Sequence, residues 1–180
     1  NPNNPTGTWL KKTNLYNFLK LVPKNIIVVI DEAYFEYVEN VEYPDSSLWL
    51  NEFSNLIVTR SFSKAFGLAA LRIGYGLSSP QISDLLNRVR QPFNSNSFAQ
   101  AAAIAALEDT EFIRKSIEIN HDGLAQLEEG FKKLGLNFIP SVGNFLTVKI
   151  GEKLSEVDSS LQQKGIIVRP VENYGLSGFL

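Results

Sequence analysis

Five consecutive aliphatic residues, Ile26–Ile30, run directly into two carboxylates, Asp31 and Glu32. An uninterrupted aliphatic run of this length indicates a strand that is buried on both faces, as in a parallel sheet covered by helices. A solvated turn after such a strand would more usually contain Gly, Asn, Ser or Pro. Because open α/β sheets bind their ligands at the carboxyl ends of the strands, Asp31 is a candidate for chemistry.

The order of the other predicted elements is that of an α/β protein. A helix is predicted near Lys11–Leu21, and further β-runs are predicted at Leu56–Thr59 and Arg72–Leu77. Strands separated by longer segments favour an α/β sheet over a sandwich. Helical sequence follows from about Gln81 and includes a long amphipathic helix that ends near Gly135.

The tail of the chain predicts a second, smaller domain. Two β-runs, FLTVKI at 145–150 and GIIVRP at 165–170, flank a predicted helix around Leu154–Lys164. We therefore expect residues 1–118 to form part of a large domain with a mostly parallel sheet. Residues 119–180 are expected to form a connecting helix and part of a small βαβ-like domain.

Composition excludes several classes of protein. The chain is 44% hydrophobic and 20% charged, an ordinary globular mix, and its net charge of −2 gives no electrostatic footprint for nucleic acid. No apolar run approaches the roughly 20 residues that span a bilayer. The absence of cysteine and the single histidine, His121, exclude disulfides, thiolate nucleophiles and Cys- or His-rich metal sites. We expect a cytoplasmic protein with no metal site.

Two features suggest that the chain is a fragment. It contains no methionine, and it opens inside a loop-like motif, NPNNPTG. We therefore expect parts of a working site to lie outside these 180 residues.

The segment after the second β-run carries further reactive groups. In VTRSFSKAFG, Lys64 follows a buried strand among Ser61, Ser63 and two phenylalanines. An apolar pocket lowers the pKa of a lysine, and a neutral amine can form a Schiff base with a carbonyl. If the two strands are parallel neighbours, Asp31 and Lys64 leave the sheet at one edge. The guanidinium of Arg72 and the serine hydroxyls would there form a phosphate cradle.

An amine, a carboxylate and a phosphate cradle around one crevice are what pyridoxal 5′-phosphate requires. The lysine holds the aldehyde, the acid keeps the pyridine nitrogen protonated, and the cradle anchors the phosphate. Each group also has an interpretation without a function: Lys64 could be a surface lysine, and Arg72 could pair with a surface acid. Glu32 and Glu36 are expected to be structural or solvated.

Five segments then match a known family in order and spacing: NPNNPTG, DEAYFEY, SFSKAFGLAALRIGYGL, PFNSNSFAQAAA and GIIVRPVENYGL. Over essentially its whole length the chain resembles the fold-type-I aminotransferases, and most closely the histidinol-phosphate aminotransferases. The resemblance implies an aspartate aminotransferase-like α/β fold and pyridoxal phosphate as cofactor. It also implies a homodimer that catalyses histidinol-phosphate:2-oxoglutarate transamination in histidine biosynthesis, with histidinol phosphate and glutamate as its amino-group substrates.

The resemblance also implies roles for individual residues. Asn4 and Tyr34 would bond the phenolic oxygen of the cofactor, and Asp31 would pair with its pyridine nitrogen. Lys64 would hold the cofactor as a Schiff base and shuttle the proton between the α-carbon of the substrate and C4′. Alternatively, Asn4 is only a turn residue and Tyr34 belongs to the core.

The remaining implied roles concern the phosphate and the parts of the family's site that this chain lacks. Ser61 and Arg72 would hold the phosphate, with help from Ser63. The glycine-rich phosphate loop and the ring-stacking aromatic residue of the family would precede Asn1. The arginine that binds the α-carboxylate of the substrate would follow Leu180.

Other functions stay open from the sequence. Ser61–Lys64 satisfies the S-x-x-K pattern of serine acyl-enzymes, but the S-D-N and K-T-G elements of those enzymes are absent. A non-catalytic pyridoxal phosphate-binding regulatory domain would keep the fold. Aromatic amino acid aminotransferases and threonine-phosphate decarboxylases share the cofactor motifs, because fold and cofactor do not fix the substrate.

Overall fold

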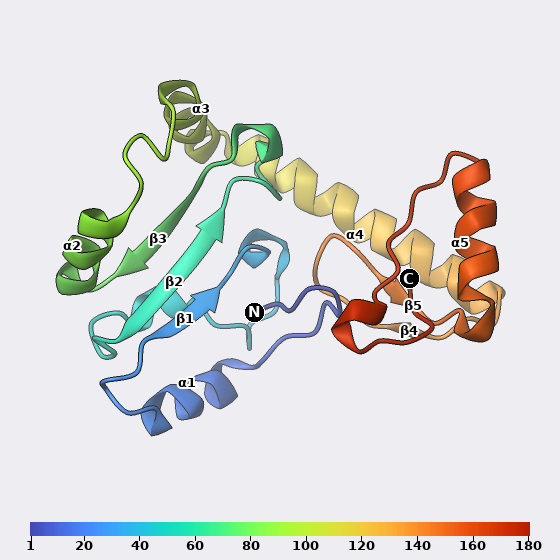
Figure 1. The fold of residues 1–180 in the computed structure, drawn as a ribbon, viewed down its shortest axis with the longest axis horizontal. Coiled ribbons are helices and arrows are strands. Elements are labelled where there is room, and N and C mark those ends of the chain that lie inside the picture. Colours follow the sequence, from blue (N-terminus) through green and yellow to red (C-terminus); the bar gives the residue numbers. More distant parts are fainter. The chain divides into compact units, whose positions relative to one another are not determined.

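The computed structural model describes all residues from Asn1 to Leu180, which form two compact units (Figure 1). The first unit contains residues 1–2 and 9–119, and the second contains residues 3–8 and 120–180. The boundary at 119 and 120 falls inside the long helix α4, Thr110–Lys133. No helix has the combination of length and apolar character needed to cross a membrane.

The first unit contains a three-stranded sheet, with one helix before it and further helices after it in the sequence. Its elements are α1 (Lys12–Leu21), β1 (Val28–Asp31), β2 (Leu56–Ser61), β3 (Gly74–Ser78), α2 (Pro80–Val89), α3 (Ser97–Glu108) and the first part of α4. Short 3₁₀ helices occupy Phe35–Tyr37, Ser46–Trp49 and Ala69–Leu71. The helix and the three strands predicted for this part of the sequence are confirmed, with small shifts at their ends.

The sheet is mixed, in the order β1-β2-β3. β1 and β2 are parallel, as predicted, with Asp31 opposite Thr59. β3 runs antiparallel to β2, with Gly74 opposite Ser61, so the expectation of a mostly parallel sheet holds for one of the two pairings. The connection from β2 to β3, residues 62–73, contains only a 3₁₀ turn at Ala69–Leu71 and no α-helix. Parallel strands are usually joined by a helical crossover, so this connection favours an antiparallel return.

One face of this sheet packs on α1. The core cluster joins Leu15 and Leu19 of α1 to Ile30, Trp49, Leu56 and Val58. β1 was expected to be buried on both faces, and this expectation is wrong, because Val29 is 57% exposed. Strand alternation directs Ile30 into the cluster under the sheet and turns Val29 to the opposite face, which residues 1–180 leave exposed at this position.

The second unit differs from the predicted βαβ arrangement. β4 (Phe138–Ile139) and β5 (Thr147–Val148) pair antiparallel, and α5 (Leu154–Gln163) follows a 3₁₀ turn at Gly151–Lys153. The stretch at 165–170, predicted as a strand, forms none, and Ile167 is 87% exposed. Leu180 pairs with β5 instead: the backbones of Val148 and Leu180 exchange hydrogen bonds of 2.9 and 3.0 Å. A last 3₁₀ helix spans Glu172–Tyr174.

We expect Leu56→Ala to destabilise the first unit by about 2–5 kcal/mol, because it would leave a cavity in a close-packed cluster. Leu56 has no exposed surface, whereas Leu21, at the end of α1, is 83% exposed. The matched control Leu21→Ala should therefore change the free energy of unfolding by no more than about 0.5 kcal/mol. Urea denaturation followed by circular dichroism measures both, and equal effects would contradict the proposed core.

Candidate functional site

A cavity of about 330 Å³ opens in the first unit where β1 and β2 end. It is lined by residues of the two strand ends, the turn after β2 and the start of β3: Asp31, Ala33, Thr59, Arg60, Ser61, Ser63, Arg72, Ile73 and Gly74. Four of the predicted site residues are in this lining. The cavity therefore lies at the sheet edge where the sequence predicted the crevice.

The carboxylate of Asp31 enters this cavity from the open face of the sheet. Asp31 follows Val29 at two-residue spacing and stands opposite Thr59, so it shares the uncovered face rather than the core. Its Oδ1 accepts a hydrogen bond of 3.0 Å from the backbone N–H of Ala33. This bond fixes one carboxylate oxygen at the end of β1.

The turn after β2 collects hydroxyl groups and a guanidinium. The Oγ of Ser61 accepts a hydrogen bond of 3.0 Å from the backbone N–H of Ser63. Arg72 Nη1 donates to Ser63 Oγ at 3.3 Å and to the carbonyl of Ala69 at 2.9 Å. Both acceptors are neutral, so the positive charge of Arg72 remains uncompensated by these bonds and suits an anion.

The return into β3 brings Arg72 to this turn. Arg72 adopts a left-handed backbone conformation with φ of 52°, which reverses the chain just before the strand. At Gly74, an added Cβ would lie 2.7 Å from the carbonyl oxygen of Arg60, closer than real Cβ atoms come. Glycine is therefore required for β3 to approach β2 next to the serines.

Lys64 lies in the same turn but outside the lining of the cavity. Its neighbours Phe62, Ala65 and Phe66 are buried, while Lys64 itself is half-buried. The ammonium Nζ lies 5.3 Å from the centroid of the Tyr34 ring, within the range of a cation–π contact. Tyr34 is itself buried, so the lysine and the tyrosine predicted as site residues are brought together.

A buried ion-pair network lies behind the two strand ends. Arg60 donates from Nε and Nη2 to Glu32 Oε2 at 3.0 and 2.8 Å, and from Nη2 to Asp45 Oδ1 at 2.6 Å. The backbone N–H of Ser46 donates to Glu32 Oε1 at 3.1 Å, and the guanidinium stacks 3.5 Å from the centroid of the Phe35 ring. Glu32 has no exposed surface, which makes its role structural, one of the two readings from the sequence.

The charges in this network shift one another's pKa values. Burial alone would lower the pKa of Arg60, but the hydrogen bonds and charges of Glu32 and Asp45 outweigh burial and raise it. Burial raises the pKa of Glu36, against the opposing effect of Arg60. For Asp45, bonds from Ser47 and the charge of Arg60 overcome burial and lower the pKa. At neutral pH, Arg60 is therefore held as a cation between carboxylates.

Sequence reasoning missed Arg60 and Asp45. A signal for Arg60 exists, because it follows Leu56 and Val58 at two-residue spacing and so falls on the buried side of β2. A charge on a buried side needs a partner, and Glu32 follows Ile30 at the same spacing on β1. No such periodicity points to Asp45, which lies in the loop between the strands.

Asn4 is the one predicted site residue that is not part of the first unit. It belongs to the turn at residues 3–8, which groups with the second unit. Within that turn the backbone N–H of Gly7 donates to the carbonyl of Asn3 at 2.8 Å. The role predicted for Asn4 stays a prediction.

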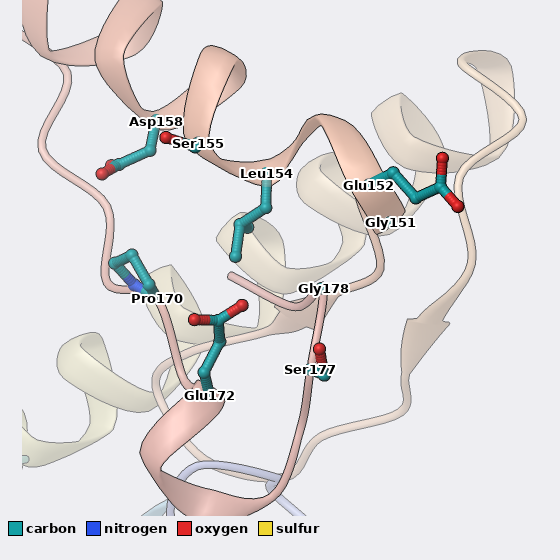
Figure 2. Close-up of a pocket in the computed structure, with 9 residues that line it drawn as sticks. All are labelled: Gly151, Glu152, Leu154, Ser155, Asp158, Pro170, Glu172, Ser177 and Gly178. Carbon is teal, nitrogen blue, oxygen red and sulfur yellow. The ribbon is translucent and has the colours of Figure 1, made fainter.

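A second cavity, of about 500 Å³, lies in the second unit (Figure 2). Its charged lining residues are all acidic: Glu152, Asp158 and Glu172. Carboxylates repel a phosphate, and no lysine or arginine in the lining offsets them. This cavity does not suit an anionic cofactor, so the cavity at the strand ends is the candidate site.

The donor set of the cavity in the first unit fits pyridoxal phosphate. Hydroxyls and the guanidinium of Arg72 suit a phosphate, and the carboxylate of Asp31 suits a protonated pyridine nitrogen. The turn that carries Ser63 and Arg72 also carries the amine of Lys64. A serine acyl-enzyme is disfavoured, because Ser61 ends a strand instead of opening a helix.

Comparison with known proteins agrees with this chemistry. The family model of aminotransferase class I and II matches residues 1–180. Histidinol-phosphate aminotransferase 2 of Pseudomonas fluorescens strain Pf0-1 is 54% identical over 180 residues, which are 100% of this chain and 49% of that protein. The chain thus spans about half the length of the relatives that it matches.

Solved structures give the same result for the fold. The crystal structure of histidinol-phosphate aminotransferase from Sinorhizobium meliloti in complex with pyridoxal-5′-phosphate superposes with a TM-score of 0.86 at 33% identity, over 94% of this chain and 47% of that one. A Thermus thermophilus aspartate aminotransferase variant gives 0.83 at 25% identity, over 99% and 52%. The predicted aspartate aminotransferase-like fold is confirmed, and the chain belongs to the class I and II aminotransferase family.

Proposed function

We propose that the protein to which this chain belongs is a pyridoxal phosphate-dependent aminotransferase that converts histidinol phosphate and 2-oxoglutarate in histidine biosynthesis. The observation that carries the proposal is the cavity with Asp31 on one strand end and Ser61, Ser63 and Arg72 around the next. The identity of 54% to a histidinol-phosphate aminotransferase supports the choice of substrate.

Each side chain has a distinct task in this proposal. When bound, the cofactor supplies an electrophilic carbonyl and an electron-withdrawing ring. The carboxylate of Asp31 holds the proton of the pyridine nitrogen in place by charge. Lys64 Nζ holds the cofactor and, once released, moves a proton to and from the substrate carbon, a general acid–base role.

The phosphate end needs groups that bind rather than react. The guanidinium of Arg72 supplies charge and directed N–H donors, and the hydroxyls of Ser61 and Ser63 supply neutral ones. Asn4 and Tyr34 are proposed to bond the phenolic oxygen of the ring. Tyr34 is well suited to a fixed position, because it is buried beneath the ammonium of Lys64.

The wider organisation follows from the same family membership. We propose that residues 1–118 are part of the cofactor-binding large domain, and that residues 119–180 are the connecting helix and part of the small domain. The working enzyme is proposed to be a cytoplasmic homodimer. The second candidate, a non-catalytic cofactor-binding domain, is less favoured because Lys64 stands in the turn of the cavity with its amine beside Tyr34.

We expect Lys64→Ala in the full-length protein to lower the turnover number of transamination by at least about 100-fold, because it removes the proton-transfer group. Lys115→Ala, an exposed lysine on α4, serves as the control and should leave turnover unchanged. Glutamate formation in a coupled assay measures both variants. Near-normal turnover of Lys64→Ala would overturn the proposed function.

We expect Asp31→Asn to keep the cofactor bound while turnover falls by about 100-fold or more, in line with the loss of one preorganised electrostatic group. Asparagine can still accept the hydrogen bond from Ala33 N–H, so the strand end should keep its shape. Asp84→Asn removes an exposed carboxylate paired with Arg88 and is the matched control. Retention of a tenth of parental turnover by Asp31→Asn would make Asp31 structural.

The choice of substrate is tested by comparing kcat/KM for different amino-group donors. We expect kcat/KM for histidinol phosphate to exceed that for phenylalanine and tyrosine by at least about 100-fold, because a site built for a charged group rejects analogues that lack it. Release of carbon dioxide from threonine phosphate is measured in parallel. Higher kcat/KM for an aromatic amino acid, or carbon dioxide release as the main reaction, would assign the protein to one of the two alternatives.

A further inference from the structure

We infer that Arg60 is a positioning residue of the site, whose fork between Glu32 and Asp45 sets the separation of the two strand ends that carry Asp31 and Ser61. The inference rests on the proposed function, because it assigns these two strand ends to the pyridine and phosphate ends of one cofactor. In this role Arg60 contacts neither the pyridine end nor the phosphate end of the cofactor. It acts through Asp31 and Ser61, the residues next to Glu32 and Arg60 in the chain.

The bonds of Arg60 tie β2 to two different segments. Two of its nitrogens donate to one oxygen of Glu32, at 3.0 and 2.8 Å, and Nη2 also donates to Asp45 at 2.6 Å. The other oxygen of Glu32 accepts from Ser46 N–H. A single planar guanidinium thus joins the end of β1, the end of β2 and the loop that follows β1, a geometry that requires the rigid arginine fork.

On each strand, the residue of the ion pair is the sequence neighbour of a predicted site residue. Asp31 directly precedes Glu32, and Ser61 directly follows Arg60. The parallel ladder continues to this point, since Glu32 N–H donates to the carbonyl of Thr59 at 2.8 Å. We infer that any change in the Glu32–Arg60 pair that alters the spacing of the two backbones also moves the carboxylate of Asp31 relative to the hydroxyl of Ser61.

Two arginines line the cavity, and their surroundings differ. Arg72 is exposed and its hydrogen bonds go to the neutral oxygens of Ser63 and Ala69, which leaves its charge available. The side chain of Arg60 is only 11% exposed, faces two carboxylates and is stacked on Phe35. Arg60 already has more negative than positive charge around it, so it is not the ligand of a phosphate.

The test uses the full-length protein and compares Arg60→Lys with wild type. Lysine keeps the charge but lacks the planar fork, so it cannot reproduce the geometry of the bonds to Glu32 and Asp45. We therefore expect about a 100-fold lower kcat, as for small misplacements of reacting groups. We also expect the pH at which the visible absorbance of the bound cofactor changes to shift. That absorbance reports protonation of the Schiff base to Lys64, which responds to how closely Asp31 is held at the pyridine nitrogen. Thermal melting of the cofactor-free protein follows the fold separately.

The control is Glu118→Gln, which removes a carboxylate from an exposed pair with Arg114 and should change none of these readouts. A fall in melting temperature with wild-type absorbance titration and kcat would make Arg60 merely structural and overturn the inference alone. If Arg60→Lys does not fold, Asp45→Asn decides, because Asp45 is 34% exposed and its loss leaves the Glu32 bonds intact. A wild-type protein that binds no pyridoxal phosphate would overturn the proposed function together with this inference.

Discussion

The ion pair between Glu32 and Arg60 is the interaction on which the geometry of the strand ends depends. Both groups lie behind the sheet edge, and Glu32 is wholly excluded from solvent. Removing one partner of such a pair typically costs about 3–5 kcal/mol, because the other charge is left buried without compensation. The ion pair therefore helps to hold β1 and β2 in one register at their carboxyl ends, where the hydrophobic core ends and the polar lining of the cavity begins.

Along β1 and β2, side chains that stabilise the fold alternate with side chains that line the cavity. Ile30 and Glu32 face the covered side of β1, whereas Val29 and Asp31 face the open side. On β2, Leu56, Val58 and Arg60 share one side and Thr59 and Ser61 the other. A run of adjacent residues can thus stabilise the fold and line a site at the same time, because successive side chains point in opposite directions.

The antiparallel return of β3 adds the third part of the site. Residues 62–73 form a compact turn in which Phe62 packs on Phe66, with ring centroids 4.9 Å apart. Phe62 also packs on Tyr75 of β3, with centroids 5.5 Å apart. This aromatic packing fixes the turn that carries Lys64, and the left-handed Arg72 then directs the chain into β3. Ser63, Lys64 and Arg72 are consequently held by one short, packed segment.

The sequence by itself determined the α/β class, the positions of the first three strands and five candidate site residues, because aliphatic runs and reactive residues that follow them are local signals. The other two candidates, Asn4 and Tyr34, came from the resemblance to the aminotransferases. Only the tertiary structure decided the antiparallel direction of β3, the open face of β1 and the absence of a strand at 165–170. It also decided that Arg60 binds Glu32 and Asp45, while Arg72 faces neutral oxygens. Pairing direction, burial and charge partners depend on residues far apart in the chain. Local spacing can place Arg60 and Glu32 on the buried side of their strands, but it does not show that these strands are neighbours or that Asp45 reaches them.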